Sequence, residues 1–139
     1  MNMIVCVKQV TDPEAPPSSF KIDPATNKLV PQTGVPFVIS PFDEQAVEAA
    51  LKIKDAKGGK ITVISLGVNL LRDVVKKPLS LGADELILLE DPAFIDGDSW
   101  STAYALAAAI KKVGQFDLIF CGRQAADSRS EERRVGKEC

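Results

Sequence analysis

Apolar runs alternate with segments of helical periodicity along the whole chain. Four short runs rich in Val, Ile and Leu predict buried strands, and they span residues 3–10, 60–66, 85–89 and 118–121. Three longer segments repeat apolar residues every three or four positions, as helices do, and they cover residues 41–57, 70–81 and 99–113. Strands that alternate with helices imply right-handed crossovers. The pattern therefore predicts an α/β fold with a doubly wound, mainly parallel sheet.

The ends of the first two predicted helices carry distinct signals. Ser40 suits the N-cap, Pro41 the first helical position, and Gly58 the stop of the first helix. Asn69 is the expected cap of the second helix. Pro78 removes one backbone donor near its end, so we expect a kink there.

The remaining segments are shorter or less regular. Short alternation in residues 20–23 and 28–30, around the turn "PATN", predicts a hairpin. Asp98 or Ser99 is expected to cap the last helix, and Trp100 is expected in the core or at its rim. The expected apolar face of this helix consists of Ala103, Leu106, Ala107 and Ile110.

Composition narrows the chemistry. The 139 residues include no His, which removes the commonest general base and zinc ligand. The net charge of −2, without a dominant basic run, gives no sign of a nucleic-acid partner. Cys6, Cys121 and Cys139 form no CxxC pair, which favours a reducing cytoplasm. No apolar stretch reaches the roughly 18 residues of a membrane span, and no metal site is expected.

A ligand of such a sheet is expected at the carboxyl ends of the strands, where the strand order reverses. The first and fourth predicted strands would be neighbours there, which brings residues 6–9 close to residues 122–127. Ser40 would face the same edge. Each candidate has an ordinary structural alternative: a core thiol for Cys6 and Cys121, a plain helix cap for Ser40, and a strand-end turn for Gly122 and the two residues after it. The phosphate-binding patterns GxGxxG and GxxxxGK[ST] are absent.

Several segments together resemble the β subunit of electron-transfer flavoprotein. They read, in order, "IVCVKQV", "KIDPATNKLV", "SPFDEQAVEAALKIKD", "ITVISLG", "LGADELILLED" and "DLIFCGRQAAD". The resemblance implies an adenine-nucleotide-binding, Rossmann-like α/β domain. It implies an α subunit that carries the redox FAD, and AMP or a second FAD bound to the β subunit. It also implies electron transfer from acyl-CoA dehydrogenase-type flavoenzymes to a quinone reductase, by a carrier without catalytic residues of its own.

The resemblance carries the nucleotide contacts of the family onto twelve residues. They are Cys6, Ser40, Pro41, Phe42, Asp43, Leu66, Gly122, Arg123, Gln124, Ala125, Ala126 and Asp127. Cys6 and Leu66 offer small or apolar walls to adenine, and residues 40–43 present a helix N-terminus. An ATP-binding α/β domain, either an adenylyl-transfer enzyme or a nucleotide sensor, is the alternative. Residues 10–13, "VTDP", lack the Ser/Gly-rich loop that such an enzyme needs after its first strand.

The last residues depart from the family pattern. Seven of the eleven residues 129–139, "RSEERRVGKEC", are charged. The string resembles a translated sequencing-adapter oligonucleotide, in which AGA-TCG-GAA-GAG-CGT encodes Arg-Ser-Glu-Glu-Arg. We therefore expect residues 1–128 to form a partial nucleotide-binding domain, truncated after the fourth main strand, and residues 129–139 to be a non-native tail. Because the family continues after Asp127 into a helix that holds phosphates, this chain is expected to bind nucleotide weakly.

Overall fold

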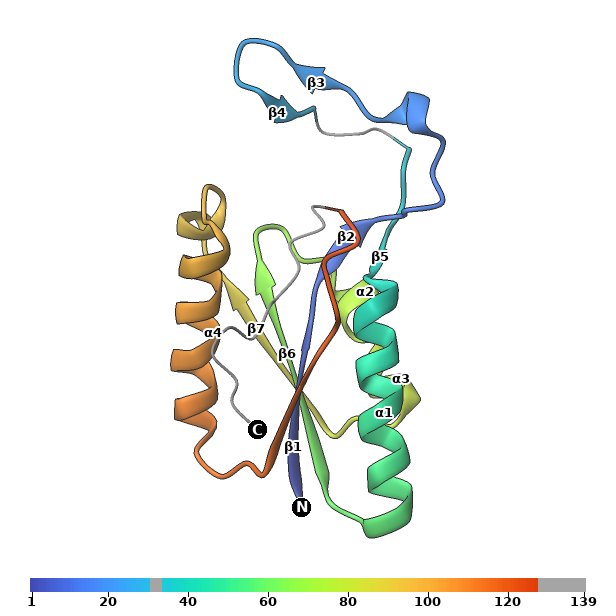
Figure 1. The fold of residues 1–139 in the computed structure, drawn as a ribbon, viewed down its shortest axis with the longest axis vertical. Coiled ribbons are helices and arrows are strands. Elements are labelled where there is room, and N and C mark those ends of the chain that lie inside the picture. The colour runs from blue at the N-terminus through green and yellow to red at the C-terminus, as the bar shows by residue number, and fades with distance from the viewer. Residues whose placement is uncertain (31–33, 128–139) are drawn as a thin grey trace, which may run out of the picture.

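The central feature is a four-stranded parallel sheet in the order β7-β6-β1-β8. The computed structural model describes residues 1–30 and 34–127 (Figure 1). The strands are β1 (Asn2–Val7), β6 (Lys60–Gly67), β7 (Glu85–Glu90) and β8 (Leu118–Cys121). The order confirms the predicted doubly wound α/β fold with the first and fourth main strands side by side. The predicted tail lies outside the described residues.

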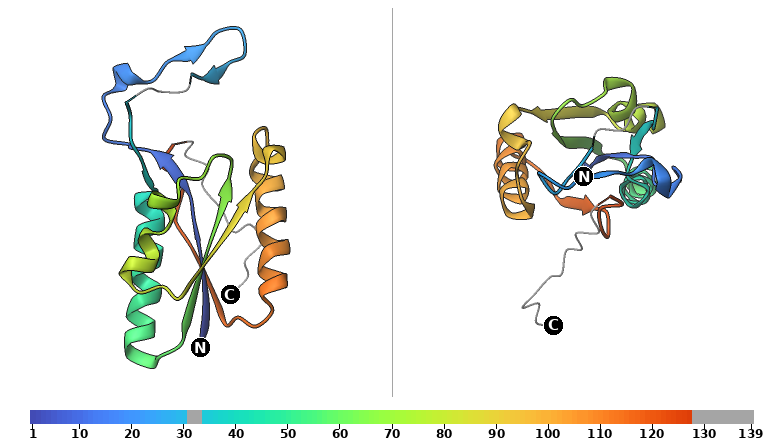
Figure 2. Two further views of the ribbon diagram at one scale, coloured as in Figure 1. Left: turned by 180° about the vertical axis from the view of Figure 1, so that it is seen from behind. Right: turned by 90° about the horizontal axis from the view of Figure 1, so that it is seen from above.

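Helices cover both faces of this sheet, as Figures 1 and 2 show. On one side lie α1 (Pro41–Lys57), α2 (Arg72–Val75) and α3 (Lys77–Leu81), and on the other lies α4 (Ser99–Val113). The side chains of Met3, Val5 and Val7 pack toward α1, whereas those of Ile4 and Cys6 pack toward α4. This alternation is what a strand buried on both faces requires.

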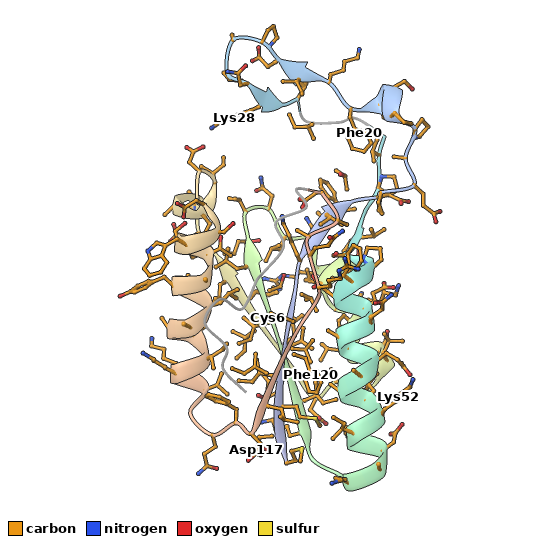
Figure 3. The ribbon with its side chains drawn as sticks, viewed as in Figure 1. Cys6, Phe20, Lys28, Lys52, Asp117 and Phe120 are labelled. Carbon is orange, nitrogen blue, oxygen red and sulfur yellow. The ribbon has the colours of Figure 1, made fainter. Side chains whose placement is uncertain are left out.

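An excursion leaves the carboxyl edge of the sheet between β1 and α1. The short strands β2 (Gln9–Thr11) and β5 (Phe37–Ile39) pair antiparallel at its base. Beyond a 3-10 turn (Pro17–Ser19), β3 (Ile22–Asp23) and β4 (Lys28–Leu29) form the predicted hairpin. Figure 3 shows Lys28 on this hairpin, and its ammonium pairs with Asp96 in the loop before α4.

The predicted continuous strand over residues 3–10 is wrong at one position. The chain leaves the main sheet after Val7, and Gln9 begins β2 in a different sheet. The break falls at Lys8, whose backbone is bonded to the start of α1 rather than to a neighbouring strand. A period of apolar residues cannot reveal such a change of partner.

The predicted helix over residues 70–81 is two short helices instead. Pro78 lies in the first turn of α3, where its missing N–H costs nothing, so the chain restarts a helix there rather than kinking one. Asn69 does not cap α2: its φ is +55°, and Leu71 holds the N-cap position. Glu90 accepts a hydrogen bond from the Leu70 N–H at 2.8 Å instead.

The last helix begins as predicted but turns a different face inward. Asp98 and Ser101 form a reciprocal capping box at its N-terminus. Leu106 and Ile110 pack on the sheet as expected, together with Ala109 and Val113. Ala103 and Ala107 are exposed, and Trp100 is 77% exposed, so the expectation of a core or rim tryptophan is wrong.

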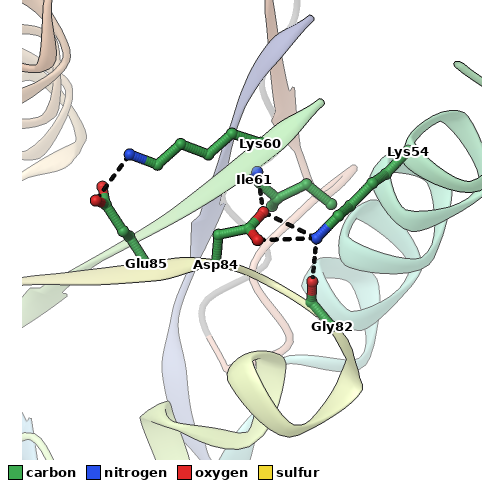
Figure 4. A network of polar contacts seen from close by, with 6 residues as sticks. All are labelled: Lys54, Lys60, Ile61, Gly82, Asp84 and Glu85. Carbon is green, nitrogen blue, oxygen red and sulfur yellow. Dashed lines mark hydrogen bonds and ion pairs between the residues drawn. The ribbon is translucent and has the colours of Figure 1, made fainter. Parts of the chain in front are cut away.

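At the amino edge of the sheet, a carboxylate joins β6, α1 and the turn before β7 (Figure 4). Asp84 accepts a hydrogen bond from the Ile61 N–H at 2.8 Å and forms an ion pair with Lys54 at 2.9 Å. The Lys54 ammonium also donates to the Gly82 carbonyl at 2.9 Å. These bonds hold the pKa of Asp84 below its usual value, first through the Ile61 N–H and then through Lys54.

Candidate functional site

The carboxyl ends of β1 and β8 lie next to each other at the point where the strand order reverses. Cys6 of β1 stands opposite Cys121 of β8 in the register of the two parallel strands. Residues 6–9 and 122–127 therefore meet at one edge, as predicted from the sequence. Figure 3 shows Cys6 in the interior between the two helical layers.

The peptide units on both sides of Lys8 are held by the N-terminus of α1. The Lys8 carbonyl accepts a hydrogen bond from the Ser40 N–H at 2.9 Å. The Lys8 N–H donates to Asp43 Oδ2 at 2.8 Å. Two backbone groups that leave the sheet at the end of β1 thus find their partners in the first turn of a helix.

The same Asp43 carboxylate contacts the first residue after β8. The backbone N–H of Gly122 is a second hydrogen-bond partner of Asp43. A Cβ at position 122 would lie 2.2 Å from Asp43 Oδ1 and 2.9 Å from the Phe42 carbonyl carbon. Glycine is therefore needed here for the close approach of the loop after β8 to the start of α1.

Burial dominates the titration of this carboxyl group. Asp43 is a buried charged residue, and desolvation raises its pKa to about 6. The hydrogen bonds from Lys8 and Gly122 and the charge of Lys8 act in the opposite direction, while the charge of Asp127 adds to the increase. The carboxylate is thus held by donors that only partly offset its loss of water.

Two basic residues, Lys8 and Arg123, lie at this edge. Lys8 Nζ lies 2.8 Å from Asp127 Oδ1, in an ion pair whose two side chains are 44% and 34% exposed. The first turn of α1 offers fewer donors than its position suggests, because the N–H groups of Asp43 and Glu44 both bond to the Ser40 carbonyl. The N-terminus of α1 therefore contributes little to any anion-binding character of this edge, and its charge comes from the basic side chains, of which Lys8 is already paired with Asp127.

Two buried hydroxyl groups at the carboxyl ends have no hydrogen-bond partner within the described part of the chain. They are the Oγ atoms of Ser40, which precedes α1, and of Ser65, which lies on β6 opposite Val7 of β1. Ser40 occupies the N-cap position as predicted, but its side chain makes no capping bond. Orphaned buried hydroxyls are uncommon, so these two fit a site built to meet further polar atoms.

The predicted contact residues do not all lie together. Four of them lie at the start of α1, either in contact with one another or next to residues that are: Ser40, Phe42, Asp43 and Gly122. Cys6 faces the α4 side, and Leu66 is half-buried on β6, which β1 separates from β8. Pro41, Arg123 and Asp127 are exposed, and the half-buried residues of the loop after β8 are Gln124, Ala125 and Ala126.

Lys8 and Gln9 belong to the predicted edge, residues 6–9, but not to the twelve residues onto which the family resemblance carries the nucleotide contacts. Gln9 Oε1 accepts from the Leu71 N–H at 2.7 Å, and Gln9 Nε2 lies 3.4 Å from the Asn69 carbonyl oxygen. Gln9 therefore fixes the loop after β6, and Lys8 carries the charge beside it. A charged residue inside an otherwise apolar run is the signal in the sequence that distinguishes Lys8 within residues 6–9.

Comparison with known proteins gives the family. A model for the electron transfer flavoprotein domain matches residues 29–137. The chain belongs to the electron transfer flavoprotein family. It is 45% identical, over 91% of its length, to the electron transfer flavoprotein subunit beta of Thermoanaerobacterium thermosaccharolyticum, 46% of which is covered. The similarity therefore places the chain among the β subunits.

Two further relatives carry other names. Protein FixA of Azorhizobium caulinodans is 40% identical over 91% of this chain and 45% of its own length. The caffeyl-CoA reductase-Etf complex subunit CarD of Acetobacterium woodii is 43% identical over 99% of this chain and 50% of its own length. The chain spans about half the length of these curated relatives of the flavoprotein family.

Two cavities in the described part of this flavoprotein-family chain lie away from the predicted site. One cavity of about 340 Å³ lies at the amino edge, beside the end of α4, and is lined in part by Asn2, Thr62 and Gly114. Another, of about 480 Å³, is lined by residues of α2 and α3, from Asp73 to Ser80. We favour the carboxyl edge, since the orphaned hydroxyls and the charged groups lie there and strand order reverses there.

Residues 1–30 and 34–127 show neither a cluster of metal ligands nor a membrane-spanning helix. This part of the chain contains no group of three or more His, Cys, Asp or Glu placed to hold a metal ion. None of its helices is long and apolar enough to cross a membrane.

Proposed function

We propose that the carboxyl edge of this sheet binds an adenine nucleotide, AMP or FAD. The observation that carries the proposal is the meeting of the ends of β1 and β8 with the first turn of α1, where the buried hydroxyl of Ser40 has no hydrogen-bond partner among residues 1–30 and 34–127. Cys6 and Leu66 would line the adenine ring, and Lys8 together with Arg123 would face the phosphates.

We propose further that the chain acts in a cytoplasmic electron carrier rather than as an enzyme. Its relatives are named as subunits of electron transfer flavoproteins and of a caffeyl-CoA reductase-Etf complex. Such a carrier would pair with an α subunit that holds the redox FAD. It would take electrons from acyl-CoA dehydrogenase-type flavoenzymes and pass them to a quinone reductase. The bound nucleotide would supply the adenine group that the site recognises and, where it is FAD, a redox-active flavin.

Isothermal titration of the full 139-residue chain with AMP and with FAD tests the binding proposal. We expect saturable, weak binding of at least one of them. Lys8→Ala should weaken it, because the ammonium is lost from the site. Lys52→Ala is the matched control, since Lys52 is an exposed lysine of α1 (Figure 3). Absence of binding by the wild-type chain, or equal losses in the two variants, would contradict the proposal.

A further inference from the structure

We propose that Asp43 is a positioning residue: its carboxylate clips the ends of β1 and β8 to the first turn of α1 and so sets the shape of the nucleotide site without itself contacting the nucleotide. This role rests on the proposed function for its consequence in binding. The clip itself is a property of the protein backbone and can be tested separately.

The bonds of Asp43 point inward, to backbone groups. Oδ2 accepts the Lys8 N–H at 2.8 Å, and the carboxylate also takes the Gly122 N–H. Asp43 is only 9% exposed, so little of it can meet a ligand from outside. A nucleotide carries negative phosphates, which a carboxylate would repel rather than bind. The position of the residue in the site therefore fits a supporting role.

Both strand ends depend on the same side chain. Lys8 is the residue at which the chain leaves the main sheet, and Gly122 is the first residue after β8. The Ser40 N–H, three residues before Asp43, holds the other side of the Lys8 peptide. Moving the carboxylate would free the Lys8 N–H and let the loop of residues 122–127 move away from α1.

The charges around the clip determine how it responds to protons. From the β1–β2 junction Lys8 faces it, and from the loop after β8 Asp127 faces it, with Arg123 directly after Gly122. On α1 itself, Glu44 is paired with Lys77 of α3 at 2.5 Å. A proton on Asp43 would withdraw one acceptor from two N–H donors. Acid should therefore loosen the clip and lower nucleotide affinity.

Asparagine tests the role of the negative charge with little change of shape. In Asp43→Asn the amide oxygen can accept one N–H, but the amide nitrogen presents hydrogens to the other. We expect AMP affinity to fall about tenfold at pH 7.5, as for a buried hydrogen bond to a charged group. Asp55→Asn, which removes an exposed carboxylate near the end of the same helix, should bind AMP as the wild-type chain does.

The first measurement concerns the clip alone. In the full chain without nucleotide, the amide proton resonances of Lys8 and Gly122 should shift together, with a midpoint near pH 6. Both shifts should be absent in Asp43→Asn and retained in Asp55→Asn. Amide resonances that do not move in the wild-type chain would overturn the clip, whatever the nucleotide result.

The second measurement is AMP affinity between pH 7.5 and 5.5 for the same three proteins. The phosphate of AMP titrates in all three, so the ratio of wild-type to Asp43→Asn affinity isolates Asp43. We expect this ratio to fall from about tenfold toward one as the pH drops. Equal affinities at pH 7.5 would overturn the positioning role while the proposed function stands. No AMP or FAD binding by the wild-type chain would overturn the proposed function and the positioning role with it.

Discussion

Two aspartates at opposite ends of the sheet both accept hydrogen bonds from backbone N–H groups, but their surroundings differ. Asp84 at the amino edge and Asp43 at the carboxyl edge each accept a backbone N–H from a different segment, at 2.8 Å in both cases. Asp84 also has Lys54 at 2.9 Å and a side chain 37% exposed. Asp43 is buried, and the ammonium of Lys8 binds Asp127.

The two carboxyl groups therefore titrate in opposite directions. Hydrogen bonds and a lysine lower the pKa of Asp84, whereas burial raises that of Asp43 to about 6. An ionised carboxylate that is poorly compensated costs stability and has to be held by its surroundings. Poorly compensated buried charges are typical of functional sites, where the geometry needed for a ligand matters more than maximal stability. The amino edge is built for stability, and the carboxyl edge is the candidate for function.

The largest expected effect comes from closing the space beside Asp43. Gly122→Ala would place a methyl group 2.2 Å from Asp43 Oδ1, and we expect it to lower the free energy of unfolding by about 3 kcal/mol. Gly58→Ala is the control for backbone strain: its site is open, so its φ of +73° and ψ of −177°, a conformation almost confined to glycine, should alone cost about 1–2 kcal/mol. Urea denaturation measures both, and equal losses would mean that the loop after β8 moves freely.

Removing the negative charge should lower the free energy of unfolding more at Asp84 than at Asp43. Asp84→Asn loses its ion pair to Lys54, and we expect it to lower the free energy of unfolding by about 1.5 kcal/mol at pH 7. Asp43→Asn loses a hydrogen bond but also removes a buried charge, so its net change should stay within about 0.5 kcal/mol. A larger loss for Asp43→Asn than for Asp84→Asn, measured by urea denaturation, would reverse the comparison.

The pH dependence of stability should differ in sign. The folded pKa of Asp43 lies above its unfolded value of 3.8, so its contribution to stability grows as the pH falls from about 7 through 6 toward 4. The folded pKa of Asp84 lies below 3.8, so its contribution is present above that pH and is lost on further acidification. Thermal unfolding between pH 3 and 7 should show the first effect missing in Asp43→Asn and the second missing in Asp84→Asn. A wild-type curve parallel to that of Asp43→Asn between pH 4 and 7 would contradict the assigned burial effect.

The smallest expected effect concerns the orphaned hydroxyl groups. Ser65→Ala removes a buried Oγ without a partner in the described part of the chain, so stability should be unchanged or rise by up to about 1 kcal/mol. Ser101→Ala removes an Oγ that accepts the Asp98 N–H at 2.9 Å, and should cost about 0.5 kcal/mol. A clear loss in Ser65→Ala would show that its hydroxyl already has a structural partner.

The sequence predicts the regular elements better than the links between them. The parallel order, the hairpin, the cap at Asp98 and the positions of Ser40 and Pro41 at the start of α1 follow from local pattern, and the structure confirms them, although Ser40 makes no side-chain capping bond. The strand β5 was missed, since three residues after Pro36 carry too little periodicity to be recognised. The break at Lys8 was missed because its cause is a carboxylate 35 residues away.

The site shows the same limit. The edge could be located from strand order alone, and residues 40–43 and 122–127 could be assigned to it. The family resemblance could not indicate that Asp43 is turned inward to backbone N–H groups. Nor could the apolar period of α4 distinguish Ala103 and Ala107 from Ala109 and Val113, because both sets fit a helical face.

The most direct test of a nucleotide site at the carboxyl edge is a map of amide chemical-shift changes on adding AMP to the full chain. The account predicts that the changes gather at residues 6–9, 40–43 and 122–127, around the meeting of β1, α1 and β8. Changes gathered instead around Asn2, Thr62 and Gly114, at the amino-edge cavity, would contradict it.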